Sequence, residues 1–184
     1  MHGLWANLFK SNGPKEDTRA LLANTKIFAS LSNRELDSID RIMYRRYYEA
    51  GETIFQQGDP GIGMYIIQFG MIAIVQMPAK HELAELHAGD FFGEIALLNE
   101  TPRSAAAVAK NDCTLLCLSQ PDLLGLFKRN PKLAYKVLLP LSQITGQRVI
   151  QLDHDVLSLH QKIAELSPAS NGSGEEEQGS LNGN

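Results

Sequence analysis

The sequence predicts a mainly β fold, a small antiparallel barrel or roll with flanking helices and a long C-terminal helix. Between residues 43 and 118, short runs rich in β-branched and aromatic residues alternate with turn signals. After residue 130 the apolar residues recur with the period of a helix. The turns come roughly every ten residues, at Gly51-Glu52, Gly58-Asp59-Pro60-Gly61, Gly70, Pro78 and Gly89-Asp90.

Helices before and after the β-rich part are predicted from their capping residues. The Ser-x-x-Glu pattern at 32–35 is a capping box, which opens a short helix that runs through Ile42. Ser119 caps a second helix, which runs towards Arg129, and a third helix begins at Pro131. Within this third pattern, Pro140 removes a backbone hydrogen bond and Gly146 follows, so we expect two helical segments with a flexible joint.

The C-terminal helix carries a heptad seam. Its a positions hold β-branched residues and its d positions hold leucine, the choice that favours a parallel two-stranded coiled coil. We therefore expect a homodimer through this helix, and the alternative is a helix that packs on its own barrel. The seam residues, spaced alternately by three and four, are Val149, Leu152, Val156, Leu159, Ile163 and Leu166.

The two ends of the chain differ from its centre. Leu4, Trp5, Leu8 and Phe9 predict a short amphipathic helix, which either docks on the protein itself or anchors to a membrane or partner. The last residues are rich in Gly, Ser, Asn and Glu and predict a disordered acidic tail. The expected organisation is an extension at 1–17, the β-roll domain at 18–130, the C-terminal helix at 131–166 and the tail at 167–184.

Composition and residue spacing argue against several classes of function. The formal net charge of −4 gives no basic surface for nucleic acid, so direct DNA binding is not expected. No apolar run approaches the ~20 residues that span a bilayer. The only cysteines, Cys113 and Cys117, fit a reduced cytoplasmic protein. The histidines show no metal-ligand spacing, and no catalytic constellation is present, so we expect neither a cofactor nor an enzyme.

The most informative segment is 92–106, which reads FGEIALLNETPRSAA. Gly93 lets the backbone approach an anion closely, and the run Ile95 to Leu98 predicts a one-turn helix whose N-terminal amides attract it. Arg103 can hold two phosphate oxygens at once, and Glu94 is placed to accept a hydrogen bond from a sugar hydroxyl. These residue types together predict a site for a phosphate joined to a ribose.

At these residues the sequence resembles the cyclic nucleotide-binding domain family, whose phosphate-binding cassette reads nearly F-G-E-[ILV]-A-L-x-x-x-x-P-R-x-A. The resemblance covers about residues 27–141 and includes Gly-Glu-Thr-Ile-Phe at 51–55 and Ala-Gly-Asp-Phe-Phe-Gly-Glu at 88–94. It implies an eight-stranded, jelly-roll-like β-roll with N-terminal helices and a C-terminal dimerisation helix.

The resemblance also implies a role for individual residues. Glu94 would bond the ribose 2′-hydroxyl, Arg103 would pair with the cyclic phosphate, and Ser104 would touch phosphate or base. The phosphate would also lie on the amides of Ile95 and Ala96. The base would lie under the C-terminal helix, with Arg148 as a stacking partner. Candidate apolar walls of the site are Met64, Ile74, Leu86, Leu97 and Val108.

The function that the resemblance implies is a cytoplasmic cyclic nucleotide sensor, with cyclic AMP as the first-choice ligand and cyclic GMP as the alternative. Ligand binding would shift the joint at 140–146. No helix-turn-helix domain is expected beyond Leu166, and no inhibitory segment or membrane pore, so the output would pass through an unidentified protein effector. The alternative is a dimeric scaffold or adaptor that keeps this fold and binds no cyclic nucleotide.

Overall fold

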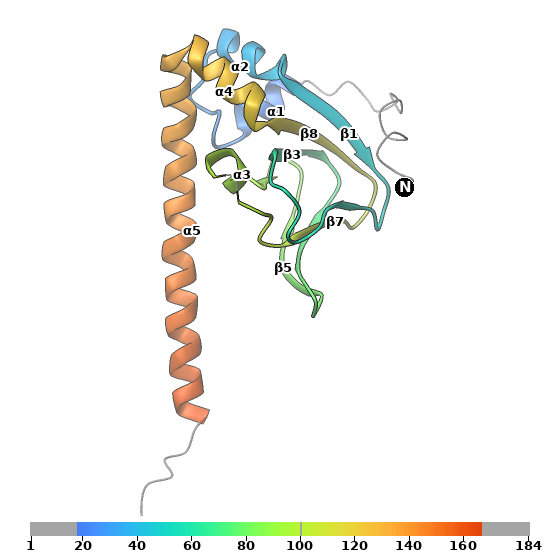
Figure 1. Cartoon of the computed structure of the whole chain (residues 1–184), viewed down its shortest axis with the longest axis vertical. Helices are drawn as coiled ribbons and strands as arrows, with labels where there is room; N and C mark the ends of the chain where they lie inside the picture. The colour runs from blue at the N-terminus through green and yellow to red at the C-terminus, as the bar shows by residue number, and fades with distance from the viewer. Residues whose placement is uncertain (1–17, 100, 167–184) are drawn as a thin grey trace, which may run out of the picture. The chain divides into compact units, whose positions relative to one another are not determined.

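The computed structural model describes residues 18–99 and 101–166 of the chain (Figure 1). The predictions for 1–17 and 167–184 lie outside these residues. The chain divides into two compact units, Met1–Ser142 and Gln143–Asn184, and each is described by itself.

Within residues 18–99 and 101–166, eight strands form two four-stranded antiparallel sheets, which confirms the predicted mainly β fold. One sheet has the order β1-β8-β3-β6 and the other β2-β7-β4-β5. Strands that lie far apart in the sequence are thus neighbours, as expected for a roll. The strands are β1 (Met43–Tyr48), β2 (Thr53–Phe55), β3 (Gly63–Phe69), β4 (Ile72–Gln76), β5 (His81–Leu86), β6 (Phe91–Phe92), β7 (Ala106–Ala109) and β8 (Cys113–Ser119).

The main core cluster lies between the two sheets. Ile67 of β3 and Leu115 of β8 are cross-strand partners and both belong to it. Side chains alternate along a strand, so Tyr65 and Ile67 lie on one face of β3 and Met64 and Ile66 lie on the other. Met64 and Ile66 are buried as well. The helix at 95–98 contacts β3 and the helix at 120–129 contacts β8, the neighbour of β3 in this sheet. Figure 1 shows the order of these elements along the chain.

Five helices flank the sheets in the described part of the chain. Two of the predicted caps are present: the Ser32 amide donates to Glu35 Oε2 over 2.8 Å, and the Ser119 hydroxyl accepts from the Asp122 amide over 3.3 Å. Both caps satisfy amides that the first helical turn leaves unpaired. The helices are α1 (Thr18–Asn24), α2 (Asn33–Asp40), α3 (Ile95–Leu98), α4 (Gln120–Arg129) and α5 (Pro131–Leu166).

Helix α5 runs without interruption through Pro140 and Gly146, so the prediction of two helical segments is wrong. Proline removes one backbone bond, but Leu133, Val137 and Leu141 are fully buried on either side of it. Burial of these three side chains outweighs the lost bond. The boundary between the two units nevertheless falls between Ser142 and Gln143, inside the predicted joint.

An ion pair fastens the first part of α5 to α2. Lys136 Nζ donates to both carboxylate oxygens of Glu35, over 2.9 and 2.8 Å. This bond, helped by the Ser32 amide, lowers the pKa of Glu35 from its ordinary 4.5 to about 2. Because the pKa of Glu35 is lower in the folded protein, the ion pair stabilises the fold fully above pH 4.5. This stabilisation is lost as the pH falls through the folded-state pKa of about 2.

Replacing Lys136 by glutamine should therefore lower the free energy of unfolding by about 1 kcal/mol at pH 7, a small effect because the pair is partly exposed. The deficit should shrink towards pH 2, where Glu35 becomes protonated in the native protein as well. Urea unfolding followed at both pH values measures it. Lys132→Gln, one turn earlier on the same helix, is the matched control. If both variants lost the same free energy of unfolding, or if the loss did not depend on pH, the Lys136–Glu35 ion pair would not be its cause.

Candidate functional site

The chain turns sharply between β6 and α3. Gly93 adopts a φ of +73°, a conformation that side-chain-bearing residues rarely adopt. An added Cβ there would lie 2.5 Å from Arg103 Nη1, so a side chain at this position would displace the guanidinium group. The predicted short helix follows directly, and its first bond runs from the Leu97 amide to the Glu94 carbonyl over 2.9 Å. The turn thus brings the segment at Glu94 against Arg103.

The backbone of Arg103 is tied to the loop before β3. Its amide donates to the Asp59 carbonyl over 2.9 Å, and its own carbonyl accepts from the Gly58 amide over 2.9 Å. These two bonds set where the chain enters β7. The backbone of Gly58 and Asp59 therefore positions the arginine, although it lies far from it in the sequence.

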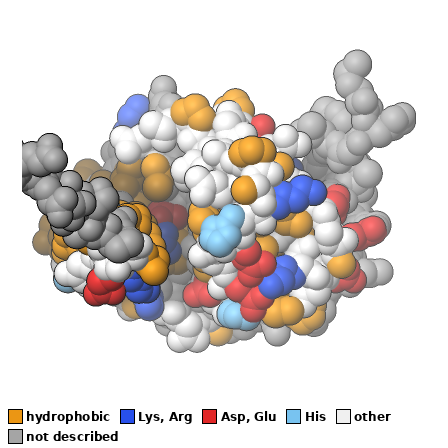
Figure 2. Space-filling view, turned by 90° about the horizontal axis from the view of Figure 1, so that it is seen from below, with side chains coloured by type: hydrophobic (Ala, Val, Ile, Leu, Met, Phe, Trp, Pro, Cys, Tyr) orange, Lys and Arg blue, Asp and Glu red, His pale blue; other side chains and the backbone are white. Residues whose placement is uncertain are grey.

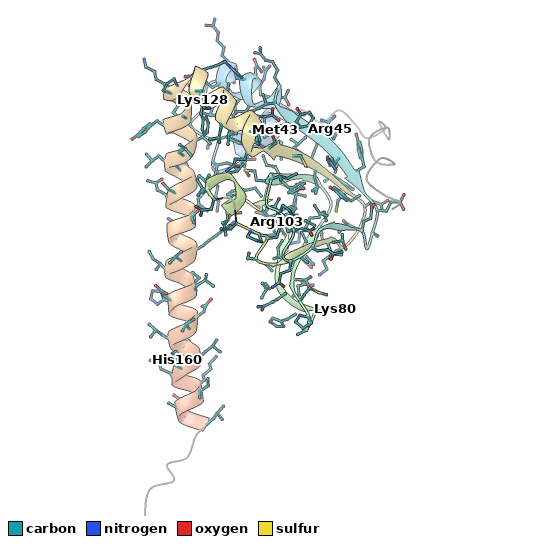
Figure 3. All side chains as sticks on the ribbon, in the orientation of Figure 1. Met43, Arg45, Lys80, Arg103, Lys128 and His160 are labelled. Atoms are coloured by element: carbon teal, nitrogen blue, oxygen red, sulfur yellow. The ribbon has the colours of Figure 1, made fainter. Side chains whose placement is uncertain are left out.

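The Arg103 side chain is buried inside the roll, with 7% of its surface exposed (Figure 3). Nη1 donates to the Gly93 carbonyl over 3.0 Å, and Nη2 donates to the Gly63 carbonyl over 2.8 Å. Nε is buried and finds no acceptor among the residues that the structure describes. The side chain is therefore bonded to carbonyl oxygens through two nitrogens and keeps one buried donor without a partner.

Two aromatic rings lie against the guanidinium group, and a third ring packs on both of them. Its Cζ lies 4.1 Å from the ring centroid of Phe55 and 5.8 Å from that of Tyr65. Phe92, the cross-strand partner of Tyr65, stacks on it with centroids 5.3 Å apart. The ring faces provide a negative quadrupole that partly compensates a buried cation.

Burial dominates the electrostatics of this cluster. It lowers the pKa of Arg103, and the charges of Asp59 and Glu94 are among the influences that oppose this shift. Burial likewise raises the pKa of Tyr65, with a further upward contribution from Cys117. Both phenol and thiol therefore stay neutral at pH 7, and the arginine is the cation of the cluster.

The other cassette residues lie around the same turn. Glu94 is 3% exposed and precedes α3 directly, whereas Ser104 is exposed. Ile95 is 44% exposed at the start of α3. Because Arg103 is bonded to the Gly93 carbonyl, the fold brings Glu94 and Ile95 close to Arg103 and Ser104. Arg148 lies on α5 in the second unit, and its role towards a ligand stays a prediction.

The candidate apolar walls divide into two groups. Leu86 and Ile74 are partly buried and pack against the cluster between the sheets, and Leu97 is buried on α3. Met64 lies on the opposite face of β3 from Tyr65, and Val108 alternates with the inward-facing alanines of β7. The structure therefore does not bring Met64 or Val108 to the aromatic cluster.

Three contacts of Arg103 were not foreseen from the sequence. Phe55 and Tyr65 provide the rings, and Gly63 provides a carbonyl acceptor. An added Cβ at Gly63 would collide with the Leu118 carbonyl, so the close approach of β3 to β8 at this point needs glycine. The sequence shows aromatic residues in the runs at 53–55, 63–69 and 91–92, which was the one signal for the cluster. Which of these strands pair is seen only in the structure.

Residues 18–99 and 101–166 contain no group of three or more His, Cys, Asp or Glu side chains arranged to hold a metal ion. They also contain no helix with the length and apolar character that crossing a bilayer requires.

Comparison with known proteins agrees with this geometry. Residues 45–130 match the family model described as "Cyclic nucleotide-binding domain". This part of the chain belongs to that family. The cyclic nucleotide-binding domain holds all of the Arg103 contacts described above, because Phe55, Gly63, Tyr65 and Gly93 lie within the matched residues.

Relatives of the cyclic nucleotide-binding domain are regulatory proteins by name. The chain is 33% identical over 135 residues to the cyclic AMP receptor protein of Thermus thermophilus, covering 72% of this chain and 62% of that protein. It is 31% identical over 99 residues to a cAMP-dependent protein kinase regulatory subunit of Hypocrea atroviridis, covering 54% of this chain and 21% of the subunit. The chain thus spans less than two thirds of either relative.

A solved structure shares the fold. A cyclic nucleotide-binding domain from Methylobacillus flagellatus superposes with a TM-score of 0.67 at 26% identity, covering 77% of this chain and 81% of that one. The roll and its flanking helices are therefore those of the family.

Proposed function

We propose that the cyclic nucleotide-binding domain binds a cyclic nucleotide, cyclic AMP in the first place and cyclic GMP as the alternative, and that binding regulates a separate protein effector. The observation that carries the proposal is Arg103, a buried cation with a spare Nε donor beside the Gly93 turn. The names of the relatives support cyclic AMP. The proposal includes a reducing, cytoplasmic location, because Cys113 and Cys117 are free thiols.

The energetics of Arg103 favour an anionic ligand. A buried donor without an acceptor costs about 1–3 kcal/mol. Carbonyl oxygens satisfy two of its nitrogens but supply only partial charge. A cyclic phosphate carries a full negative charge and two free oxygens, which match a guanidinium edge.

The remaining cassette residues have complementary roles in this proposal. Glu94 accepts a hydrogen bond from the ribose 2′-hydroxyl, and the amides of Ile95 and Ala96 donate to the phosphate. Ser104 is exposed next to Arg103 and contacts phosphate or base. These contacts together require a phosphate and a sugar in one molecule.

The proposal also includes a homodimer formed through α5. The six seam residues from Val149 to Leu166 are between 49% and 81% exposed in the single chain. Figure 2, which views the helix along its axis, shows hydrophobic side chains on its surface. A stripe of a and d residues fits a second helix of the same kind.

Calorimetric titration of the purified chain tests the ligand directly. We expect micromolar or tighter binding of cyclic AMP, weaker binding of cyclic GMP, and little heat with adenosine, which lacks the phosphate. Adding 5′-AMP separates recognition of the cyclic ester from recognition of any phosphate. If neither cyclic nucleotide gives heat or a thermal shift, the scaffold function replaces this proposal.

A further inference from the structure

The ring of Phe55 is the face on which the Arg103 guanidinium rests. The cation lies 4.1 Å from its centroid, clearly nearer than to Tyr65 at 5.8 Å. Phe55 is itself held by two other rings, since its centroid lies 5.8 Å from those of Tyr65 and Phe92. The ring under the cation is therefore packed between two other rings.

The guanidinium is constrained from three directions. The carbonyls of Gly93 and Gly63 bind two of its nitrogens at its edge, and the Phe55 ring lies under its Cζ, 4.1 Å from ring centroid to Cζ. Bonds at the edge alone would let a planar group tilt, but a ring in contact with the cation opposes tilting. Nε is the nitrogen of the group that makes no hydrogen bond to the described residues, and the direction of its N–H is set by the plane of the group.

We propose that Phe55 is a positioning residue for the anionic group of the ligand: it fixes the guanidinium plane so that Nε–H points at the bound phosphate. This inference rests on the proposed function, because it assigns the phosphate as the partner of Nε. A desolvated cation and an aromatic face attract each other more strongly than an exposed pair, which suits a side chain as buried as Arg103.

Two substitutions separate positioning from packing. Phe55→Leu removes the stacked ring and keeps apolar bulk. Phe92→Leu is the matched control, since each of these rings contacts the same number of partners in the aromatic cluster, but only the Phe55 ring is in cation–π contact with Arg103. A packing role predicts the same consequence for both variants, and a positioning role predicts a difference.

The first measurement uses the ligand-free protein and so does not depend on ligand binding. The Arg103 Nε–Hε resonance, assigned by its disappearance in Arg103→Lys, should be displaced by the ring current of Phe55. Phe55→Leu should move it towards the position of exposed arginines, and Phe92→Leu should leave it near its original place. Equal shifts in the two variants, or no initial displacement, would overturn the stacked geometry.

The second measurement is calorimetric titration of both variants with cyclic AMP. Phe55→Leu should weaken binding roughly tenfold, whereas Phe92→Leu should change it far less. Unchanged affinity in Phe55→Leu, with the wild type binding normally, would overturn the positioning role. If the wild type itself binds no cyclic nucleotide, the proposed function fails and the ligand-directed role of Phe55 fails with it, while the resonance still decides whether the ring holds the arginine.

Discussion

Replacing Arg103 by alanine is expected to weaken cyclic AMP binding by at least roughly thirtyfold, the equivalent of about 2 kcal/mol for a charged contact. The variant removes the buried cation that lies against the Gly93 turn and leaves the carbonyls of Gly63 and Gly93 in place. Those carbonyls would repel a phosphate once the guanidinium is gone. Calorimetric titration at constant ionic strength measures the loss.

Two further variants make this result interpretable. Arg34→Ala removes the same charge from an exposed position on α2 and should leave the affinity unchanged. Arg103→Lys keeps a cation but cannot reproduce two bonds at fixed angles, so its affinity should lie between those of the wild type and Arg103→Ala. Thermal unfolding of each variant shows whether the roll is intact. A folded Arg103→Ala variant with wild-type affinity would refute the proposed phosphate contact.

Placing a charge in the α5 seam is expected to convert the proposed homodimer to a monomer. Leu159 occupies a d position and is 57% exposed in the single chain. In a dimer it would be buried, and a fully buried leucine contributes about 1.5–3 kcal/mol. Leu159→Lys loses this burial in both helices and brings two like charges together, a combined effect large enough to dissociate a short coiled coil. Analytical ultracentrifugation gives the mass.

The chain offers a closely matched control for this experiment. Leu157 lies two residues earlier on the same helix, is 60% exposed, and falls outside the a and d positions. Leu157→Lys should remain dimeric over the same concentration range. If both variants, or neither, lose the dimer, the seam is not the interface, and a monomeric wild type removes the dimer from the proposal altogether.

Local signals in the sequence predicted the local structure well. The capping residues Ser32 and Ser119 are at helix starts, and Gly93 has the positive φ that the cassette turn requires. Each of these depends on a few neighbouring residues, whose steric and hydrogen-bonding preferences can be read directly. The general character of the roll followed from the spacing of strands and turns.

Contacts across the roll could not be predicted in the same way. Which side of β3 holds Met64 depends on strand register, and a shift of one residue exchanges the two faces. Phe55 and Gly63 meet Arg103 only because β2, β3 and β7 come together in space. The continuity of α5 at Pro140 likewise depends on tertiary burial of Leu133, Val137 and Leu141, which outweighs a local preference.

The carbonyl bonds of Arg103 decide which of its N–H groups a ligand can use without breaking an existing bond. A phosphate bonded to Nε leaves the bonds to Gly63 and Gly93 in place, one at the start of β3 and the other after β6. A phosphate that drew Nη1 or Nη2 away would exchange one set of hydrogen bonds for another, and the measured affinity would be the difference between the two sets. The proposed contact at Nε therefore keeps the connection between β3 and the cassette intact when the site is occupied.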